Sequence, residues 1–560
     1  MVAAWLRSVR RMYKVLIVVA LTDSCNRFVK HLSAPFYRSM VVCSDTHHAR
    51  NHTHGHKHHT HDEELVHLES QPGRRHGHHL HAVVEHGCAE IRRPHHDWSG
   101  SDHCAVRTRV VNSEVHAAGE IAMAQKVGFL TLPLFFAGPL MDVWGRKPVI
   151  LMALVGFIMQ IGFFTGAAVW YGGDGLGRQM PWLLPAGFFA GTAGAFDPAA
   201  AAMVTDLSAA TADERSAALS MMMVIHHISH MAGIGSSIAV IKMRFGDYAM
   251  VWTGVVAFVL GLFLLTLVLL RESLGACPEL TERTQGINCQ NHHELSAAGE
   301  FGATEILTRG ESSRREQFRR CFERLPLCGK CAEAARELWS DPFLWQFLLV
   351  RFSEALGATI AHAVAEPFLV GHLGYSMQVA AMGILFLPLA MASGSLVYWA
   401  LEPRLGPHTL FGGGVLAIAV GFGVCGLSGP CSEWSDVLFW GGLFVACLGA
   451  GVNDPAAYVI VSLRTASDTM GVIFAFLHAL GTLGGLAGQM LTTQVLFDAR
   501  ARGFKAGLPF FVSSGSLMVS FLWFLLAYCH RRHRRSDEGC HVEENSSEES
   551  TNSGTTSSDA

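Results

Sequence analysis

Twelve long apolar segments constrain the fold of this 560-residue chain more than any other feature. Each is about 20 residues long, the length that a helix needs to cross the hydrocarbon core of a bilayer. The segments are too long and too evenly apolar for the strands of a membrane barrel, and only 16% of all residues are charged. We therefore expect an all-α, multi-pass membrane protein with twelve transmembrane helices.

The apolar segments divide into two halves of six. The expected spans lie near residues 13–37, 117–140, 148–170, 182–205, 216–240, 249–271, 342–370, 376–400, 408–428, 436–462, 469–496 and 508–529. The first half thus comprises residues 1–37 and 117–271, and the second half comprises 342–529. Three polar segments lie outside the spans: a His-rich loop at 38–116, a connector at 272–341 and a Ser- and Glu-rich tail at 530–560. The composition of the tail predicts disorder.

Positive charges near the span ends predict which side of the membrane each loop faces. Basic residues precede the first span, fill the connector and follow the last span, whereas Arg500, Arg502 and Lys505 oppose this pattern. With twelve spans the three basic segments share one side, so we expect both termini to be cytosolic and the His-rich loop to be extracytosolic. The plasma membrane and an acidic endomembrane are both compatible with this pattern.

The two halves carry a related motif. "AGAFDPAAAAMVTDLS" at 193–208 corresponds to "GAGVNDPAAYVIVSLRT" at 449–465, with Asp197-Pro198 matching Asp454-Pro455. Two repeated halves of six helices are an architecture of secondary transporters, in which the substrate binds between the halves near the bilayer midplane.

A charged, glycine-rich turn, "GPLMDVWGRKP" at 138–148, separates the second and third spans. Its pattern G-x-x-x-D-x-x-G-R-K resembles the signature turn of the major facilitator superfamily. "DVWGRKP" is similar in particular to the branch that contains tetracycline-efflux and hippocampus-abundant-transcript transporters, as are "VTDLSAATADERSAAL" (204–219) and "FSEALG" (352–357). The resemblance implies the twelve-helix major facilitator fold and transport by alternating access.

We expect the turn to act as a conformational latch that forms only when the cytosolic side is closed; a turn that only sets topology is the alternative. Gly138 and Gly145 allow close helix approach and a tight reversal. Asp142 can accept hydrogen bonds at a facing helix N-terminus, and Arg146 can pair with Asp206. The expected latch residues are Gly138, Asp142, Gly145, Arg146, Lys147, Asp206, Glu214 and Arg215.

The fifth span departs from the pattern of superfamily antiporters. These proteins usually carry a Gly-x-x-x-Gly-Pro-type motif there, whereas this chain reads "HMAGIGSSIAV" at 230–240, without a proline. The departure favours symport or uniport over antiport.

Ionisable residues inside the spans are costly in lipid, so they are functional candidates unless they pair only to order the bundle. Arg351 and Glu354 lie one helical turn apart and share a face. Glu354 also matches a Glu of the resembled branch and lies about 18 Å into its span, near the midplane. We expect Glu354 to couple transport to protons. The candidates for transport and coupling are Glu354, Arg351, Asp23, Lys126, His226, His230 and His362, and further charged groups in the spans are Arg27, Lys30, His31, Glu120, Glu366, Asp197 and Asp454.

Two histidines of "MVIHHISHM", His226 and His230, are four residues apart and share a helix face. Three interpretations remain open: hydrogen-bonded core histidines, a proton relay, and two ligands of a metal ion. A zinc site needs three or four ligands, and a third could come from His478, Asp23 or Glu354.

The loop after the first span is rich in histidine. The stretch "NHTHGHKHHTHDEE" at 51–64 contains His52, His54, His56 and His58, which can bind zinc or copper loosely. A sensor of an acidic lumen is another interpretation. Asn51 begins an N-glycosylation sequon.

These features together predict a secondary active transporter that moves a small solute by alternating access, coupled to protons. A zinc or other divalent-metal transporter that uses the His-rich loop is the first alternative, and a non-transporting membrane sensor on the same fold is the second. The expected partners are the lipid bilayer and the solute, with no cofactor beyond protons or loosely bound zinc. The net charge of −4 gives no signal for nucleic acid, and no nucleophile–base set indicates an enzyme.

Overall fold

The computed structural model describes residues 12–33, 119–130, 137–170, 176–208, 212–243, 248–271, 273, 326–375, 377–429, 433–466, 468–498 and 501–551. Every regular element in these residues is a helix. The predictions for Asn51 and for His52, His54, His56 and His58 fall outside the described residues, as does most of the connector.

The first half contains a helix of residues 12–33 and a helix of residues 119–130. These are followed by α4 (Gly138–Val143), α5 (Arg146–Trp170), α6 (Leu176–Ala193), α7 (Phe196–Leu207), α8 (Ala212–Met243) and α9 (Tyr248–Leu269). After α12 (Pro326–Ser340), the second half contains α13 (Pro342–Gly371), α14 (Met377–Ile384), α15 (Leu387–Leu427), α16 (Ser435–Ser462), α17 (Met470–Leu491), the π-helical η2 (Thr492–Leu496) and α18 (Phe504–Thr551).

Eight helices in the described part of the chain are long and apolar enough to cross a membrane. One of them, Met382–Leu427, reverses at Gly406, whose φ of 73° lies in the left-handed region, so it supplies two spans. Helix 12–33, helix 119–130 with α4, and α6 with α7 complete the twelve. Helix 12–33 carries Asp23, Arg27 and Lys30, so it is less apolar than the eight helices above. The span made of α6 and α7 is interrupted at residues 194–195.

Helix extends into two segments that the sequence analysis assigned to a polar connector and a disordered tail. α12 lies inside the expected connector, where "AEAARELW" combines strong helix formers. Asp341 caps the next helix, since its side chain accepts hydrogen bonds from the backbone N–H groups of Phe343 and Leu344. α18 continues past the expected end of the last span to Thr551. Residues 530–551 of the expected tail contain no proline to stop this helix.

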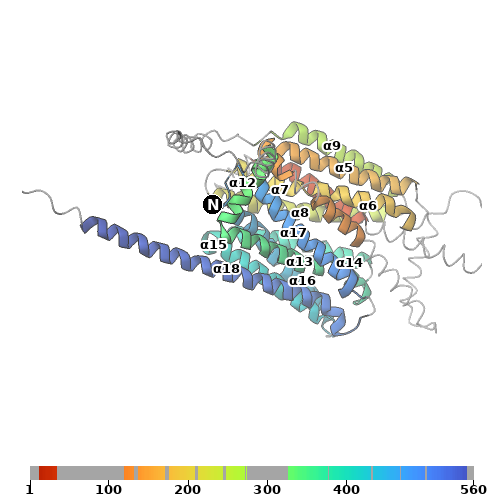
Figure 1. Ribbon diagram of the computed structural model, residues 1–560. Coiled ribbons are helices and arrows are strands. Elements are labelled where there is room, and N and C mark those ends of the chain that lie inside the picture. The colour runs from red at the N-terminus through yellow and green to blue at the C-terminus, as the bar shows by residue number, and fades with distance from the viewer. Residues whose placement is uncertain are drawn as a thin grey trace, which may run out of the picture.

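The two halves form two groups of helices (Figure 1). α8 of the first half and α17 of the second lie near the boundary between the groups, and α12 lies at one end. At the α12 end a single apolar core joins both halves, because Met12, Val149 and Met203 belong to the same buried cluster as Val472 and Tyr458. A second cluster near the opposite end, which includes Leu32, Phe164 and Trp252, lies within the first half alone. The halves are thus packed together at the α12 end.

Small residues allow the helices of each half to approach closely. A Cβ on Gly451 of α16 would lie 1.9 Å from the carbonyl oxygen of Met391 in α15. In the first half, a Cβ on Gly128 would lie 2.0 Å from the carbonyl oxygen of Phe188 in α6. Neither position can accept a larger residue without displacing a backbone.

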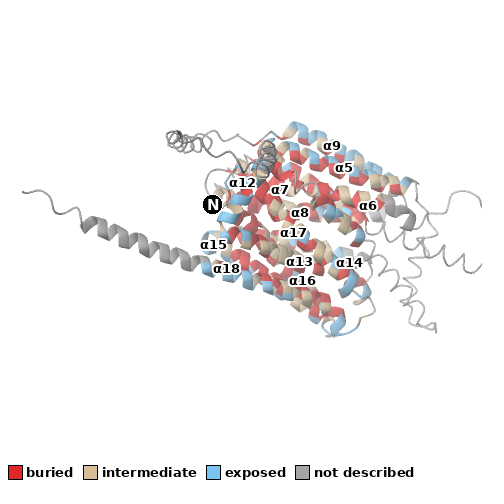
Figure 2. Ribbon diagram, viewed as in Figure 1, coloured by how far each residue is buried: buried red, intermediate tan, exposed pale blue. Residues whose placement is uncertain are grey.

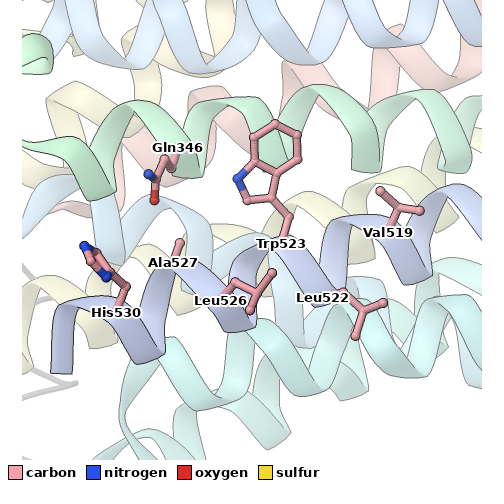
Figure 3. A pocket seen from close by; sticks show the side chains of 7 residues that line it. All are labelled: Gln346, Val519, Leu522, Trp523, Leu526, Ala527 and His530. Atoms are coloured by element: carbon pink, nitrogen blue, oxygen red, sulfur yellow. The ribbon is translucent and has the colours of Figure 1, made fainter. Parts of the chain in front are cut away.

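Exposed residues lie on the outside of the bundle (pale blue in Figure 2). Many of them are large and apolar, as expected for a surface that faces lipid. A groove of about 450 Å³ lies on this outer surface between α13 and α18 (Figure 3), and Trp523 projects from α18 across it. None of the candidate transport residues lines the groove. Its lining residues are Gln346, Val519, Leu522, Trp523, Leu526, Ala527 and His530.

Candidate functional site

The turn between α4 and α5 is built around a fully buried arginine. The side chain of Arg146 donates to Oδ1 of Asp142 at 2.8 Å and to Oδ2 of Asp206 at 3.0 Å, and none of Arg146 is exposed. Gly145 makes the turn possible, because its φ of 102° is strained for any residue with a Cβ. The expected Arg146–Asp206 pair is thus present.

The same turn joins the two halves. Asp142 accepts hydrogen bonds from the backbone N–H groups of Gly471 at 3.0 Å and Val472 at 2.9 Å, in the first turn of α17. A Cβ on Gly138 would lie 3.0 Å from Cα of Val472, so this glycine is where α4 meets α17. Asp142, Arg146, Asp206, Gly471 and Val472 are called the latch below, and the α12 end of the bundle the latch end. The geometry expected of Asp142 at a facing helix N-terminus is confirmed.

The environment of Asp142 also changes its acidity. Burial raises the pKa of Asp142 to about 6, although Arg146 and the two backbone N–H groups act to lower it. A group with this pKa titrates in the mildly acidic range instead of remaining ionised.

The remaining expected latch residues lie around this centre. Lys147 donates to the carbonyl oxygen of Leu267 at 2.8 Å. This contact is made to the C-terminal turn of α9. Arg215 reaches the other half, where it contacts the carbonyl oxygen of Ser462 at 3.4 Å. Glu214 is partly buried in the first turn of α8.

α12 adds contacts that the sequence analysis missed. Glu337 accepts hydrogen bonds from the backbone N–H of Ala466 at 2.8 Å and from the hydroxyl of Thr469. Lys330 bonds Asp468 at 3.1 Å. All three partners lie in the turn that leads into α17, so α12 supports the helix end that Asp142 contacts. The charged, amphipathic pattern of α12 was a sequence signal for such a surface helix.

The middle of α13 contains a paired carboxylate. Glu354 and Arg351 of α13 lie 2.7 Å apart, which confirms that they share a face. Asn453 of α16, which has no exposed surface, donates to the other oxygen of Glu354. Arg351 also lies 3.8 Å from Asp454. Asn453 is not among the residues predicted from the sequence, although it directly precedes Asp454 in the repeated motif.

The first half contains a mixed cluster of aspartate and histidine. Nδ1 of His226 lies 2.7 Å from Oδ2 of Asp23, and Asp197 completes a compact group with these two. The rings of His226 and His230 lie 3.9 Å apart. Of the three expected third ligands, only Asp23 lies here.

The other two expected ligands have partners elsewhere. His478 bonds the hydroxyl of Tyr458, and Glu354 bonds Arg351 and Asn453. The histidine that joins His226 and His230 is instead His227, which the sequence analysis did not consider because it lies off their shared face.

A group of cations occupies the centre of the molecule on the side away from the latch. Arg27 and Lys30 of helix 12–33 lie within electrostatic range of one another, and Lys126 of helix 119–130 lies within range of Lys30. All three are within range of His362 on α13. Lys126 extends to the second half, since a Cβ on Gly485 of α17 would lie 2.5 Å from its Nζ.

Charged groups from the two halves therefore face a common region. His226 of α8 is within electrostatic range of Asp454 on α16, and Lys126 reaches α17. A region near the midplane, lined by ionisable groups of both halves, is where transporters built from repeats bind their substrates.

A family model described as the Major Facilitator Superfamily matches residues 110–489. The chain belongs to the major facilitator superfamily. This assignment makes it a multi-pass secondary transporter of small-molecule solutes rather than an enzyme. The match is to the superfamily as a whole, so the narrower resemblance to the tetracycline-efflux branch stays a prediction.

Solved major facilitator structures have the same fold. The human organic anion transporter MFSD10 (TETRAN) aligns with a TM-score of 0.57 at 16% identity, over 91% of this chain and 99% of that chain. The proton:xylose symporter XylE bound to 6-bromo-6-deoxy-D-glucose aligns with a TM-score of 0.55 at 12% identity, over 92% and 96%. A search of curated proteins found no match. At these identities the structural similarity concerns the fold alone.

Within the major facilitator fold, the latch contacts define the conformation of this structure. The contact between Asp142 and α17, the Arg215–Ser462 contact and the shared core all lie at the latch end. The halves are therefore closed at that end.

Proposed function

We propose that this major facilitator protein carries a small anionic solute and couples its movement to protons. The latch end would face the cytosol, as the distribution of lysine and arginine around the spans predicts. The structure then corresponds to the state in which the cytosolic side is closed.

The observation that carries the proposed substrate class is the central group of cations. Among the described residues, no carboxylate lies within ion-pair distance of Lys30 or Lys126. Lys126 is partly buried, and an ammonium group without such a partner is costly inside a membrane protein. Lys30 is exposed, so it adds positive charge to this region without that cost. An anionic solute would supply the missing charge, and it would contact both halves because Lys126 reaches Gly485 of α17.

The proposed coupling site is the Glu354 pair. Glu354 is 6% exposed and lies against Arg351 and Asn453. A carboxyl group in such a place changes its proton affinity when a neighbouring cation moves, because the cation favours the charged form. Coupling requires that the two states of the transporter bind the proton differently. Rocking of the halves that alters the Arg351 contacts would meet this requirement.

The test is transport by purified protein in proteoliposomes. A mixture of small mono- and dicarboxylates is supplied with xylose as a neutral comparison, with and without an imposed pH gradient. We expect depletion of carboxylates, which the gradient enhances, and no depletion of xylose. Lys126→Met should raise the half-saturating carboxylate concentration at least about tenfold, since one charge-assisted contact contributes roughly 1.5–3 kcal/mol. Saturable transport of the neutral sugar alone would reject the anion assignment, and binding without flux would favour a sensor.

A further inference from the structure

We propose that the first half contains a binding site for a divalent transition metal, best suited to Zn²⁺, formed by His226, His227 and His230 of α8. Asp23 of helix 12–33 supports the site by holding His226. This site does not depend on the proposed solute or on proton coupling, because it lies within one half and uses none of the cations assigned to the solute.

The three imidazoles already lie close together. One ring nitrogen from each of His226, His227 and His230 lies within 4.8 Å of the other two. Nitrogens that bind one tetrahedral zinc ion at about 2.0 Å lie roughly 3.3 Å apart. Small side-chain rotations would therefore bring the three nitrogens to ligand distance, without any change in the path of α8.

His227 is the observation that points to a ligand. Only 1% of its surface is exposed, and neither of its ring nitrogens has a hydrogen-bond partner. A buried imidazole without partners loses its hydration on folding and gains nothing in return. A bound metal ion would satisfy one of these nitrogens.

His226 has the arrangement of a metal ligand whose second ring nitrogen is hydrogen-bonded to a carboxylate. Its Nδ1 is bonded to Oδ2 of Asp23 at 2.7 Å, which leaves Nε2 with a free lone pair. A carboxylate on the distal nitrogen fixes the ring and increases its basicity, as in many zinc sites. Asp23 is 2% exposed, so the bond is shielded from water.

The local charges permit a dication. Arg27 is within electrostatic range of all three histidines and opposes metal binding. Two carboxylates, Asp23 and Asp197, lie against His226 and offset that charge. Three neutral imidazoles suit zinc better than calcium or magnesium, which prefer oxygen ligands. A water molecule would occupy the fourth coordination position of a tetrahedral ion.

The burial of the site indicates a resident ion and not cargo. His227 and His230 are 1% and 4% exposed, and both belong to one helix of the first half. A substrate must reach both sides as the halves rock, whereas an ion here would move with the first half. Bound metal would tie α8 to helix 12–33 through His226 and Asp23.

The experiment uses the full chain, purified with a non-histidine affinity tag so that every variant keeps the His-rich loop. Co²⁺ is the probe, because tetrahedral Co²⁺ absorbs visible light more strongly than octahedral Co²⁺. We expect wild-type protein to show the tetrahedral spectrum for one Co²⁺ per chain, displaced by Zn²⁺. His227→Gln and His230→Gln should abolish it. Asp23→Ala should weaken binding by roughly 10- to 100-fold, as loss of a supporting carboxylate does elsewhere.

His372→Gln is the matched control, since His372 lies at the end of α13 outside the cluster and should leave the spectrum unchanged. Absence of a tetrahedral signal in the wild type overturns the site whether or not the variants fold. An unchanged signal in monodisperse His227→Gln protein also overturns it. Uptake of radioactive zinc into proteoliposomes by the wild type would overturn the resident assignment, and the carboxylate assay above is independent of both results.

Discussion

Oδ1 of Asp142 in the first half accepts a hydrogen bond of 3.0 Å from the backbone N–H of Gly471 in the second half. The two residues are 329 positions apart in the sequence, and they meet only because the latch end is closed. Asp142→Asn keeps the shape of the side chain but replaces one of its two acceptor oxygens with an NH2 group, so the backbone N–H of Gly471 or of Val472 loses its acceptor. A buried donor without an acceptor costs about 1–3 kcal/mol, so the closed state should lose roughly 5- to 150-fold in population.

The measurement for Asp142→Asn is the rate of transport by purified protein, together with yield and monodispersity as a check on folding. We expect normal folding and reduced transport. Asp436→Asn is the matched control, because Asp436 is exposed in the first turn of α16 and makes none of the latch contacts. If Asp142→Asn transports at the wild-type rate, the turn only sets topology.

Gly471→Ala should prevent closure by sterics alone. The added Cβ would lie 2.6 Å from Oδ1 of Asp142, a distance that the buried carboxylate cannot relieve while it also holds Arg146. Spin labels at the exposed positions Trp144 and Leu463, on the latch-end faces of the two halves, should show a longer mean distance. Gly441→Ala is the control, since nothing lies within 4 Å of its Cβ. Equal distances in both variants would contradict the contact.

The latch should also respond to pH. The pKa of Asp142 is raised to about 6 in the closed state by burial, whereas water in an open state would return it towards its ordinary value near 4. The closed state thus binds the proton more tightly, so its population should rise as the pH falls from 7 to 5, with no further gain below about 4. The same spin labels report this change, and the response of the wild type should exceed that of Asp142→Asn. If the wild type and Asp142→Asn show the same change of distance with pH, Asp142 is not the group that causes the pH response.

Glu354→Gln imitates the protonated carboxyl group and retains a partner for Asn453. It should abolish accumulation of solute driven by a pH gradient while preserving exchange of solute across the membrane, because the halves can still rock. Paired uptake and counterflow in proteoliposomes make this distinction. Asp436→Asn, in the exposed first turn of α16, should change neither. Gradient-driven accumulation by Glu354→Gln would transfer the coupling role to another group.

Glu337→Ala tests the support that α12 gives to the start of α17. Loss of the bonds to Ala466 and Thr469 should cost about 1 kcal/mol at this partly solvated site. We expect a lower midpoint of thermal unfolding and a more open latch end by the spin-label distances. Glu333→Ala is a control in the same helix, because within the described part of the chain the carboxylate of Glu333 pairs with Lys330 and not with the start of α17. A midpoint that falls equally in both variants would show a general effect on α12.

The sequence predicted the parts of the site that depend on local spacing. Arg351 and Glu354 lie one helical turn apart, so their shared face follows from helix geometry. The Arg146–Asp206 pair was also expected, because Asp206 lies at the end of a neighbouring span. Other partners supplied by distant packing could not be predicted. Gly471 and Asn453 are neutral residues in apolar stretches. The sequence alone does not show whether such a residue makes a specific contact or only packs in the core.

Two features were not predicted for a different reason. Helical periodicity places His227 off the face shared by His226 and His230, yet three long side chains on adjacent faces can still converge. The polar composition of residues 530–551 gives no helix signal, although helix continues there from the preceding apolar span.

The separation of Asp142 and Gly471 also bears on how the molecule is made. Ribosomes add about 5–20 residues per second, so roughly 15–65 seconds pass between the synthesis of Asp142 and that of its partner in α17. Arg146 can pair with Asp206 early, because only 60 residues separate them. During this interval the first half lies in the membrane without α17, so Asp142 lacks its hydrogen-bond donors there. The contact between the halves forms only after the eleventh helix has been inserted. Any quality-control factor that binds the exposed face of α4 has this interval in which to act.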